Sequence, residues 1–148
     1  MIDLSNGQTQ EIQSPFYPNT YPNKRQCKWV FHADEFQRIT IRFSDLAVEY
    51  HESCDFDRVT VQTGESVRTF CGNEKPFAMT SFGNRMVVEF RTDGDGDFKG
   101  FKASVVAADQ GFTFIYVLLT LTIQVHSDCF MLLWWMKQNF QISHRDSY

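Results

Sequence analysis

The sequence predicts an all-β sandwich or barrel for the part of the chain that precedes Val106. Polar and apolar residues alternate with a period of two in five segments, the pattern of a half-buried strand: 27–31, 38–43, 59–62, 86–91 and 101–105. Turn-forming Gly, Pro and Asn separate these segments, as expected for several short strands. Aromatic residues make up 16% of the chain, led by fifteen Phe, and aromatic side chains favour sheets.

Each predicted strand has one apolar face. In chain order these faces are Cys27–Trp29–Phe31, Ile39–Ile41–Phe43, Val59–Val61, Met86–Val88–Phe90 and Phe101–Ala103–Val105. The turns between them include Tyr21-Pro22-Asn23, Thr63-Gly64, Cys71-Gly72-Asn73, Phe82-Gly83-Asn84 and Asp93-Gly94-Asp95-Gly96. No helical period is apparent before Gly111. The sequence therefore predicts that this part of the chain contains strands joined by turns, without helices.

Composition excludes several classes of function. The chain has 148 residues, enough for one domain, and a net charge of −4, which argues against a nucleic-acid partner. It contains no G-x-S-x-G, no H-E-x-x-H and no phosphate-binding glycine loop, so we expect no enzyme. Its four cysteines form no C-x-x-C pair, and in a secreted chain they allow three disulfide pairings.

Five short motifs in a fixed order resemble a CUB domain. They are Ser14-Pro15-Phe16-Tyr17-Pro18 with Tyr21-Pro22, Cys27-Lys28-Trp29, Cys54-Asp55-Phe56-Asp57 with Val59-Thr60-Val61, Phe70-Cys71-Gly72, and Val87-Val88-Glu89-Phe90 with Asp93 and Gly100-Phe101. The resemblance predicts a CUB domain over 12–106, after a lead-in over 1–11. It implies a jelly-roll β-sandwich of antiparallel strands that recognises extracellular proteins and does not catalyse.

The resemblance also implies a disulfide between Cys54 and Cys71. Cys27 matches a cysteine whose family partner would fall near or before Met1, which predicts a domain truncated at its N-terminus. The alternatives for Cys27 are a buried free thiol, a bond to Cys129, or an intermolecular cross-link. Residues 1–5 do not form a signal peptide, so a secreted chain would be a fragment or an isoform.

Four acidic residues match the calcium ligands of calcium-binding CUB domains: Glu49, Asp57, Asp93 and Asp95. By the same resemblance, Tyr17 takes the place of a tyrosine that orients the acidic cluster. Calcium suits this set because it accepts six to eight oxygen ligands at flexible geometry. The alternative is that these acids are solvated residues of turns, which Asp-Gly-Asp-Gly resembles when taken alone.

The resemblance further implies a partner with a basic side chain. A Lys or Arg of an extracellular protein would bind the carboxylates of Glu49 and Asp57, and Tyr50 and His51 would flank the contact. Ordinary surface residues are the alternative for Tyr50 and His51. For the domain, the alternative is a metal-free structural role in a larger extracellular protease or membrane receptor.

Residues 107–148 form a hydrophobic tail that matches nothing in the family. The apolar run from Phe112 is shorter than a membrane helix, and extending it to 136 includes Asp128, which costs about 3 kcal/mol near a bilayer centre. The tail is predicted to be an isoform-specific extension, a membrane anchor through 112–136, or a segment packed on the sandwich. A secreted, extracellular protein is favoured over a membrane-anchored one.

Overall fold

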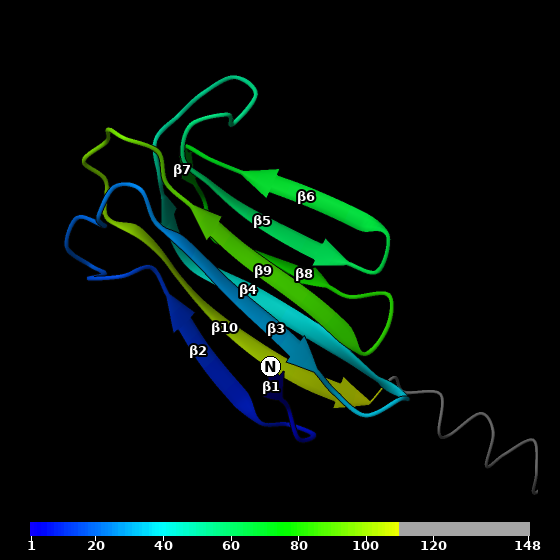
Figure 1. Ribbon diagram of the computed structural model, residues 1–148. Helices are drawn as coiled ribbons and strands as arrows, with labels where there is room; N and C mark the ends of the chain where they lie inside the picture. The colour runs from blue at the N-terminus through cyan, green and yellow to red at the C-terminus, as the bar shows by residue number, and fades with distance from the viewer. Residues whose placement is uncertain (110–148) are drawn as a thin grey trace, which may run out of the picture. The chain divides into compact units, whose positions relative to one another are not determined.

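The computed structural model describes residues 1–109, which form ten strands in two sheets (Figure 1). The strands are β1 (Ile2–Asp3), β2 (Thr9–Gln13), β3 (Gln26–His32), β4 (Gln37–Ala47), β5 (Arg58–Thr63), β6 (Ser66–Phe70), β7 (Asn73–Glu74), β8 (Phe77–Thr80), β9 (Arg85–Arg91) and β10 (Gly100–Asp109). One sheet has the order β1-β3-β9-β5-β6, and the other has the order β2-β10-β4-β7 with β8 paired to β4. The predicted all-β sandwich is confirmed.

The core lies between the two sheets and consists of the apolar faces that the alternation predicted. Phe31, Ile41 and Val88 are fully buried, and Phe101 contacts rings from both sheets. The Phe101 ring centroid lies 5.8 Å from that of Trp29 and 5.5 Å from that of Phe90 in one sheet, and 5.8 Å from that of Phe43 in the other. Interlocked aromatic side chains of this kind account for much of the stability of a core, because removing one costs about 3–5 kcal/mol.

The N-terminal strands start earlier than the predicted domain boundary at Ile12. Strand β1 pairs in parallel with β3, β2 pairs with β10, and Leu4 is buried in the core. Each strand is short and lies at a sheet edge, and in β2 the inward positions are Gln10 and Ile12, so the sequence there shows no apolar alternation. Strand β10 likewise continues through Ala107 to Asp109, past the predicted boundary at 106.

Three loops meet at one end of the sandwich, which we call the loop pole: residues 14–25, 48–57 and 92–99. Backbone hydrogen bonds join the first and the third, from Tyr21 N–H to the Phe98 carbonyl at 3.1 Å and from Lys24 N–H to the Asp93 carbonyl at 2.6 Å. Gly100 follows the third loop with a φ of +87°, and a side chain there would collide with Ser14. The fold thus holds these loops together before any ligand is considered.

A disulfide joins Cys54 to Cys71, as predicted, with the Cα atoms 5.6 Å apart. It ties loop 48–57 of the loop pole to the end of β6. Cys27 has no disulfide partner within residues 1–109, and it packs partly buried against the core. The predicted alternative of a bond to Cys129 lies outside the described residues.

The predictions for the tail from residue 110 onward, including a membrane anchor through 112–136, also lie outside the described residues. Within residues 1–109, no helix long and apolar enough to span a bilayer is found.

Replacing both Cys54 and Cys71 with Ser should lower the free energy of unfolding by about 3 kcal/mol, because the bond restricts a loop of seventeen residues in the unfolded chain. Denaturant unfolding under non-reducing conditions measures this loss. Cys27→Ala is the matched control, with an expected cost below about 1 kcal/mol. Equal losses in the two variants would contradict a stabilising role for the bond.

Candidate metal centre

Three carboxylates from different segments converge at the loop pole. Glu49 follows β4, Asp57 precedes β5 and Asp93 follows β9, and one oxygen of each lies within 4.8 Å of the others. Strand β4 belongs to one sheet, whereas β5 and β9 are neighbours in the other. The sequence-predicted ligands Glu49, Asp57 and Asp93 are therefore brought together by the two sheets.

Asp57 is the centre of this cluster and is fully buried. Its Oδ2 accepts a hydrogen bond from the Tyr21 hydroxyl at 2.5 Å, and its Oδ1 accepts one from the Asp93 backbone N–H at 2.7 Å. A buried carboxylate is costly without such partners, so these two bonds are what make the position tolerable. They also connect all three loops of the pole to one side chain.

Tyr21 is itself buried and holds two members of the cluster at once. Its hydroxyl donates to Asp57 and accepts from the Glu49 backbone N–H at 3.2 Å. Burial, followed by the hydrogen bond to Asp57, raises the pKa of the Tyr21 hydroxyl far above its usual value. The hydroxyl therefore keeps its proton and remains a donor to Asp57.

Glu49 is the member of the cluster that lacks compensation. Its Oε2 is buried and has no hydrogen-bond partner among residues 1–109. Burial, followed by repulsion from Asp57, Asp93 and Asp95, raises the pKa of the Glu49 carboxyl. A buried oxygen facing other carboxylates without a donor fits a cation, which would supply the missing positive charge.

Asp95 lies beside the cluster but is not one of its three convergent members. Its backbone N–H donates to Asp93 Oδ1 at 3.0 Å, and its own Oδ1 accepts from the Gly96 N–H at 2.9 Å. Gly96 has a φ of +119°, and a Cβ there would lie 3.2 Å from Asp57 Oδ2. Only glycine lets this loop pass so close to the carboxylates, a role that sequence reasoning did not assign to it.

Tyr17 does not contact the acidic cluster, in contrast to the prediction. Its hydroxyl donates to Asp45 at 2.8 Å, and Asp45 also pairs with Lys99 at 2.6 Å. The tyrosine that orients the cluster is Tyr21. Both residues precede a proline in the same loop, so the local sequence does not distinguish them; burial does, because Tyr21 is 1% exposed.

Exposed aromatic side chains lie on the same loop as Glu49. Tyr50 is 72% exposed and lies against Gly72, whereas His51 packs on Phe56 with ring centroids 4.3 Å apart. The His51 Nδ1 is 3.0 Å from the Ser53 hydroxyl. We call Tyr50, His51 and Phe56 the aromatic rim; Phe56, 41% exposed, was not among the predicted partner-binding residues.

Two sheets whose strands pair antiparallel, apart from β1 with β3, form a β-sandwich with a carboxylate cluster at one pole. Comparison with known families identifies the class of this sandwich. The CUB domain family model matches residues 3–105, and the chain belongs to this family. The structure and the family match therefore agree that the domain begins in the first few residues, before Ile12.

Relatives of this chain are much longer proteins. It is 36% identical to rat cubilin over 106 residues, 68% of this chain and 3% of cubilin, and 35% identical to human tolloid-like protein 1 over 63% of this chain and 10% of that protein. Among solved structures, the MASP-1 CUB2 domain bound to Ca²⁺ matches with a TM-score of 0.62 and 28% identity. That match covers 70% of this chain and 96% of the MASP-1 domain.

Removing the Tyr21 hydroxyl should destabilise the loop pole, because Tyr21→Phe leaves a buried oxygen of Asp57 without a donor. We expect the free energy of unfolding to fall by about 1–3 kcal/mol in the presence of a chelator. Tyr17→Phe is the matched control and should cost less than about 1 kcal/mol, because Asp45 keeps its ion pair with Lys99. Denaturant unfolding compares the two, and a larger loss for Tyr17→Phe would contradict the assignment.

Glu49→Gln should raise the melting temperature at neutral pH in a chelator. The raised pKa of Glu49 means that its ionisation opposes folding at pH values above the folded-state pKa, and that this penalty disappears below the ordinary value of 4.5. The gain from Glu49→Gln should therefore shrink as the pH falls towards that value. Thermal unfolding across this range measures it, and a gain that does not depend on pH would argue against repulsion at Glu49.

Proposed function

We propose that this CUB domain is an extracellular module that binds calcium at the loop pole and, when loaded, recognises a basic side chain of a partner protein. The observation that carries the proposal is the buried Glu49 Oε2, which faces two other carboxylates and has no donor within residues 1–109. The proposal assigns no catalytic role to the domain. The extracellular location is supported by the disulfide and by the relatives.

Calcium fits the donor set. It is a hard cation that prefers carboxylate, carbonyl and water oxygens, and Glu49, Asp57 and Asp93 offer carboxylates from three segments. Asp95, two residues beyond Asp93, is the proposed fourth acidic contributor. When bound, calcium supplies the positive charge that balances the cluster, so its binding would stabilise the folded pole.

Each protein group has a separate task in this site. Tyr21 and the Asp93 N–H hold the Asp57 carboxylate in one orientation. Gly96 lets the third loop approach the cluster. These groups are already in place without the ion. The proposed role of the ion is therefore to neutralise the repulsion among the three carboxylates, and it does not need to order the loops.

The partner's cation is proposed to reach Glu49 and Asp93 rather than Asp57, because Asp57 is fully buried. An ammonium or guanidinium group would form charge-assisted hydrogen bonds with the outer carboxylate oxygens. The aromatic rim of Tyr50, His51 and Phe56 provides apolar surface beside this point, which suits the aliphatic part of a Lys or Arg side chain. The sequence predicted a contact with Glu49 and Asp57; because Asp57 is buried, the proposal replaces Asp57 with Asp93.

A metal-free structural role is the second candidate, and one observation favours it. Asp57, the most buried acid, already has both oxygens bonded by protein donors. A domain of this kind would support a larger extracellular protease or receptor and would not respond to calcium.

Calcium at about one hundred times its dissociation constant should raise the melting temperature by roughly 10 °C, since ligand linkage then contributes about 2.7 kcal/mol.

In calcium, the wild-type chain should also bind a lysine-coupled matrix and be released by chelator. Glu49→Ala should lose both responses. Glu52→Ala, an exposed acid in the same loop, should keep both.

Identical melting with calcium and with chelator would rule out the metal site and favour the structural role. A calcium response without retention on the matrix would keep the metal site and remove the basic partner from the proposal.

A further inference from the structure

The outer face of the sheet β1-β3-β9-β5-β6 carries more basic than acidic side chains. Because the alternate residues of these strands point into the core, the outward positions are occupied by Lys28, Arg58, Arg85 and Arg91. The outward acids of these strands are Glu89 and, at the edge, Asp3. We call this surface the arginine face; it contrasts with a chain whose net charge is −4.

Arg58 and Arg91 lie directly opposite each other on neighbouring strands. Like charges in this position repel and destabilise a sheet. Within residues 1–109, three ion pairs fall within 4.0 Å, and neither arginine takes part in any of them. The nearby acid Glu89 is instead bonded by Gln26 at 2.6 Å. The two guanidinium groups therefore lack a protein counter-charge in the described part of the chain.

The Arg58 guanidinium is nevertheless held in position. Its Nη1 donates to the backbone carbonyls of Asp55 at 3.0 Å and Phe56 at 3.4 Å. A fixed guanidinium loses less freedom on binding an anion than a mobile one does, and it can bind an oxyanion in bidentate geometry. Arg58 thus combines an orienting contact with an unneutralised charge.

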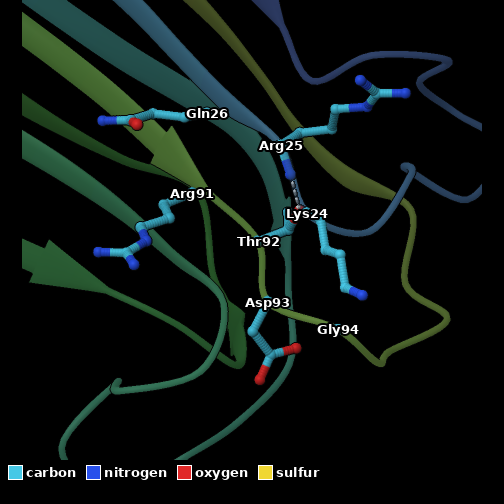
Figure 2. Close-up of a pocket in the computed structure, with 7 residues that line it drawn as sticks. All are labelled: Lys24, Arg25, Gln26, Arg91, Thr92, Asp93 and Gly94. Atoms are coloured by element: carbon cyan, nitrogen blue, oxygen red, sulfur yellow. Dashed lines mark hydrogen bonds between the residues drawn. The ribbon is translucent and has the colours of Figure 1, made fainter.

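A shallow depression of about 350 Å³ lies beside Arg91 where the sheet meets the loop pole, and its other lining residues are Lys24, Arg25, Gln26, Thr92, Asp93 and Gly94 (Figure 2). Figure 2 shows Gln26 and Arg91 extending to the same side of the strands, while the Asp93 carboxylate points away from both. That carboxylate belongs to the acidic cluster at the loop pole. The depression is at the small end of ligand sites, which suits a single ring of a larger molecule.

The arrangement fits an extended polyanion better than a single anion. Arg85 and Arg91 are six residues apart on the same face of β9, a span of about 20 Å at the rise of a strand. Lys28 lies between them, on the neighbouring strand opposite Glu89. Positive charges spread over this length match a chain that carries anionic groups at intervals.

The face also lacks the anchors of a typical protein interface. Val87, at the centre of the face, is only 5% exposed. Among the outward positions of this sheet, the exposed apolar side chain is Val67, which lies on the edge strand β6. Protein interfaces depend on buried aromatic or aliphatic anchors, whereas a sulfated polysaccharide requires cations and hydrogen-bond donors on an open surface. We propose that the arginine face binds a sulfated polysaccharide chain.

The proposal does not depend on the calcium site, and it is tested with heparin octasaccharide as the probe. Calorimetric titration at physiological salt should show binding by the full chain. Arg91→Gln should weaken it about tenfold, the loss of one charge-assisted contact, and Arg58→Gln combined with Arg91→Gln should abolish it. Arg91→Lys should retain part of the affinity, because it keeps the charge and loses the bidentate geometry.

The matched controls are Arg42→Gln and the double variant Arg38→Gln with Arg42→Gln. They remove the same number of positive charges, one or two, from the outward positions of β4 in the other sheet. These variants should bind as the wild type does. An equal loss in them would overturn the proposal, since net charge alone would then explain the binding. Desulfated heparin should bind at least tenfold more weakly.

Two further outcomes would overturn the proposal: no binding of the octasaccharide by the full chain, or equal binding of polyglutamate, which would point to an acidic protein instead. An unchanged melting temperature, together with an unchanged calcium response, shows that the Arg91→Gln chain and the double variant are still folded when their binding is weakened or lost.

Discussion

The loop pole depends on one buried carboxylate. Asp57 has no exposed surface, so its charge must be balanced by donors within the protein, and the two it has come from Tyr21 and from the backbone of Asp93. These bonds fix the relative positions of three loops that are far apart in sequence. They leave Glu49 facing other acids with a buried oxygen that no donor within residues 1–109 satisfies. The same geometry that satisfies the buried Asp57 therefore leaves negative charge uncompensated at Glu49, and the proposed calcium site rests on that charge.

The β-sandwich makes this arrangement possible by bringing segments from both sheets to one end. Strand β4 delivers Glu49, β5 begins directly after Asp57, and β9 ends two residues before Asp93. The Cys54–Cys71 disulfide restrains the loop between Glu49 and Asp57, and Gly96 allows the third loop to close on the cluster. Acids gather in these loops, whereas Arg58 and Arg91 lie opposite each other on the outer face of one sheet without an ion pair among residues 1–109.

Sequence reasoning succeeded where a residue's environment follows from its local pattern. Period-two alternation identified the inward faces of five strands, and the family resemblance indicated the Cys54–Cys71 pairing. Sequence reasoning failed where the contacts of a residue depend on three-dimensional packing. Tyr17 and Tyr21 share the same local sequence, and only burial beneath the loops directs Tyr21 to Asp57. Strands β1 and β2 carry too few buried residues to show a period, and the opposition of Arg58 and Arg91 requires the strand register.

The most direct test of the central claim is the stoichiometry and affinity of calcium binding, measured by calorimetric titration of the chelator-treated chain and of Asp93→Asn. This substitution removes a carboxylate of the cluster but keeps the backbone N–H that bonds Asp57. The account predicts one ion per chain for the wild type and binding weakened more than about tenfold in the variant, the equivalent of about 1.4 kcal/mol. A chain that takes up no calcium, or an Asp93→Asn variant with unchanged affinity, would contradict it.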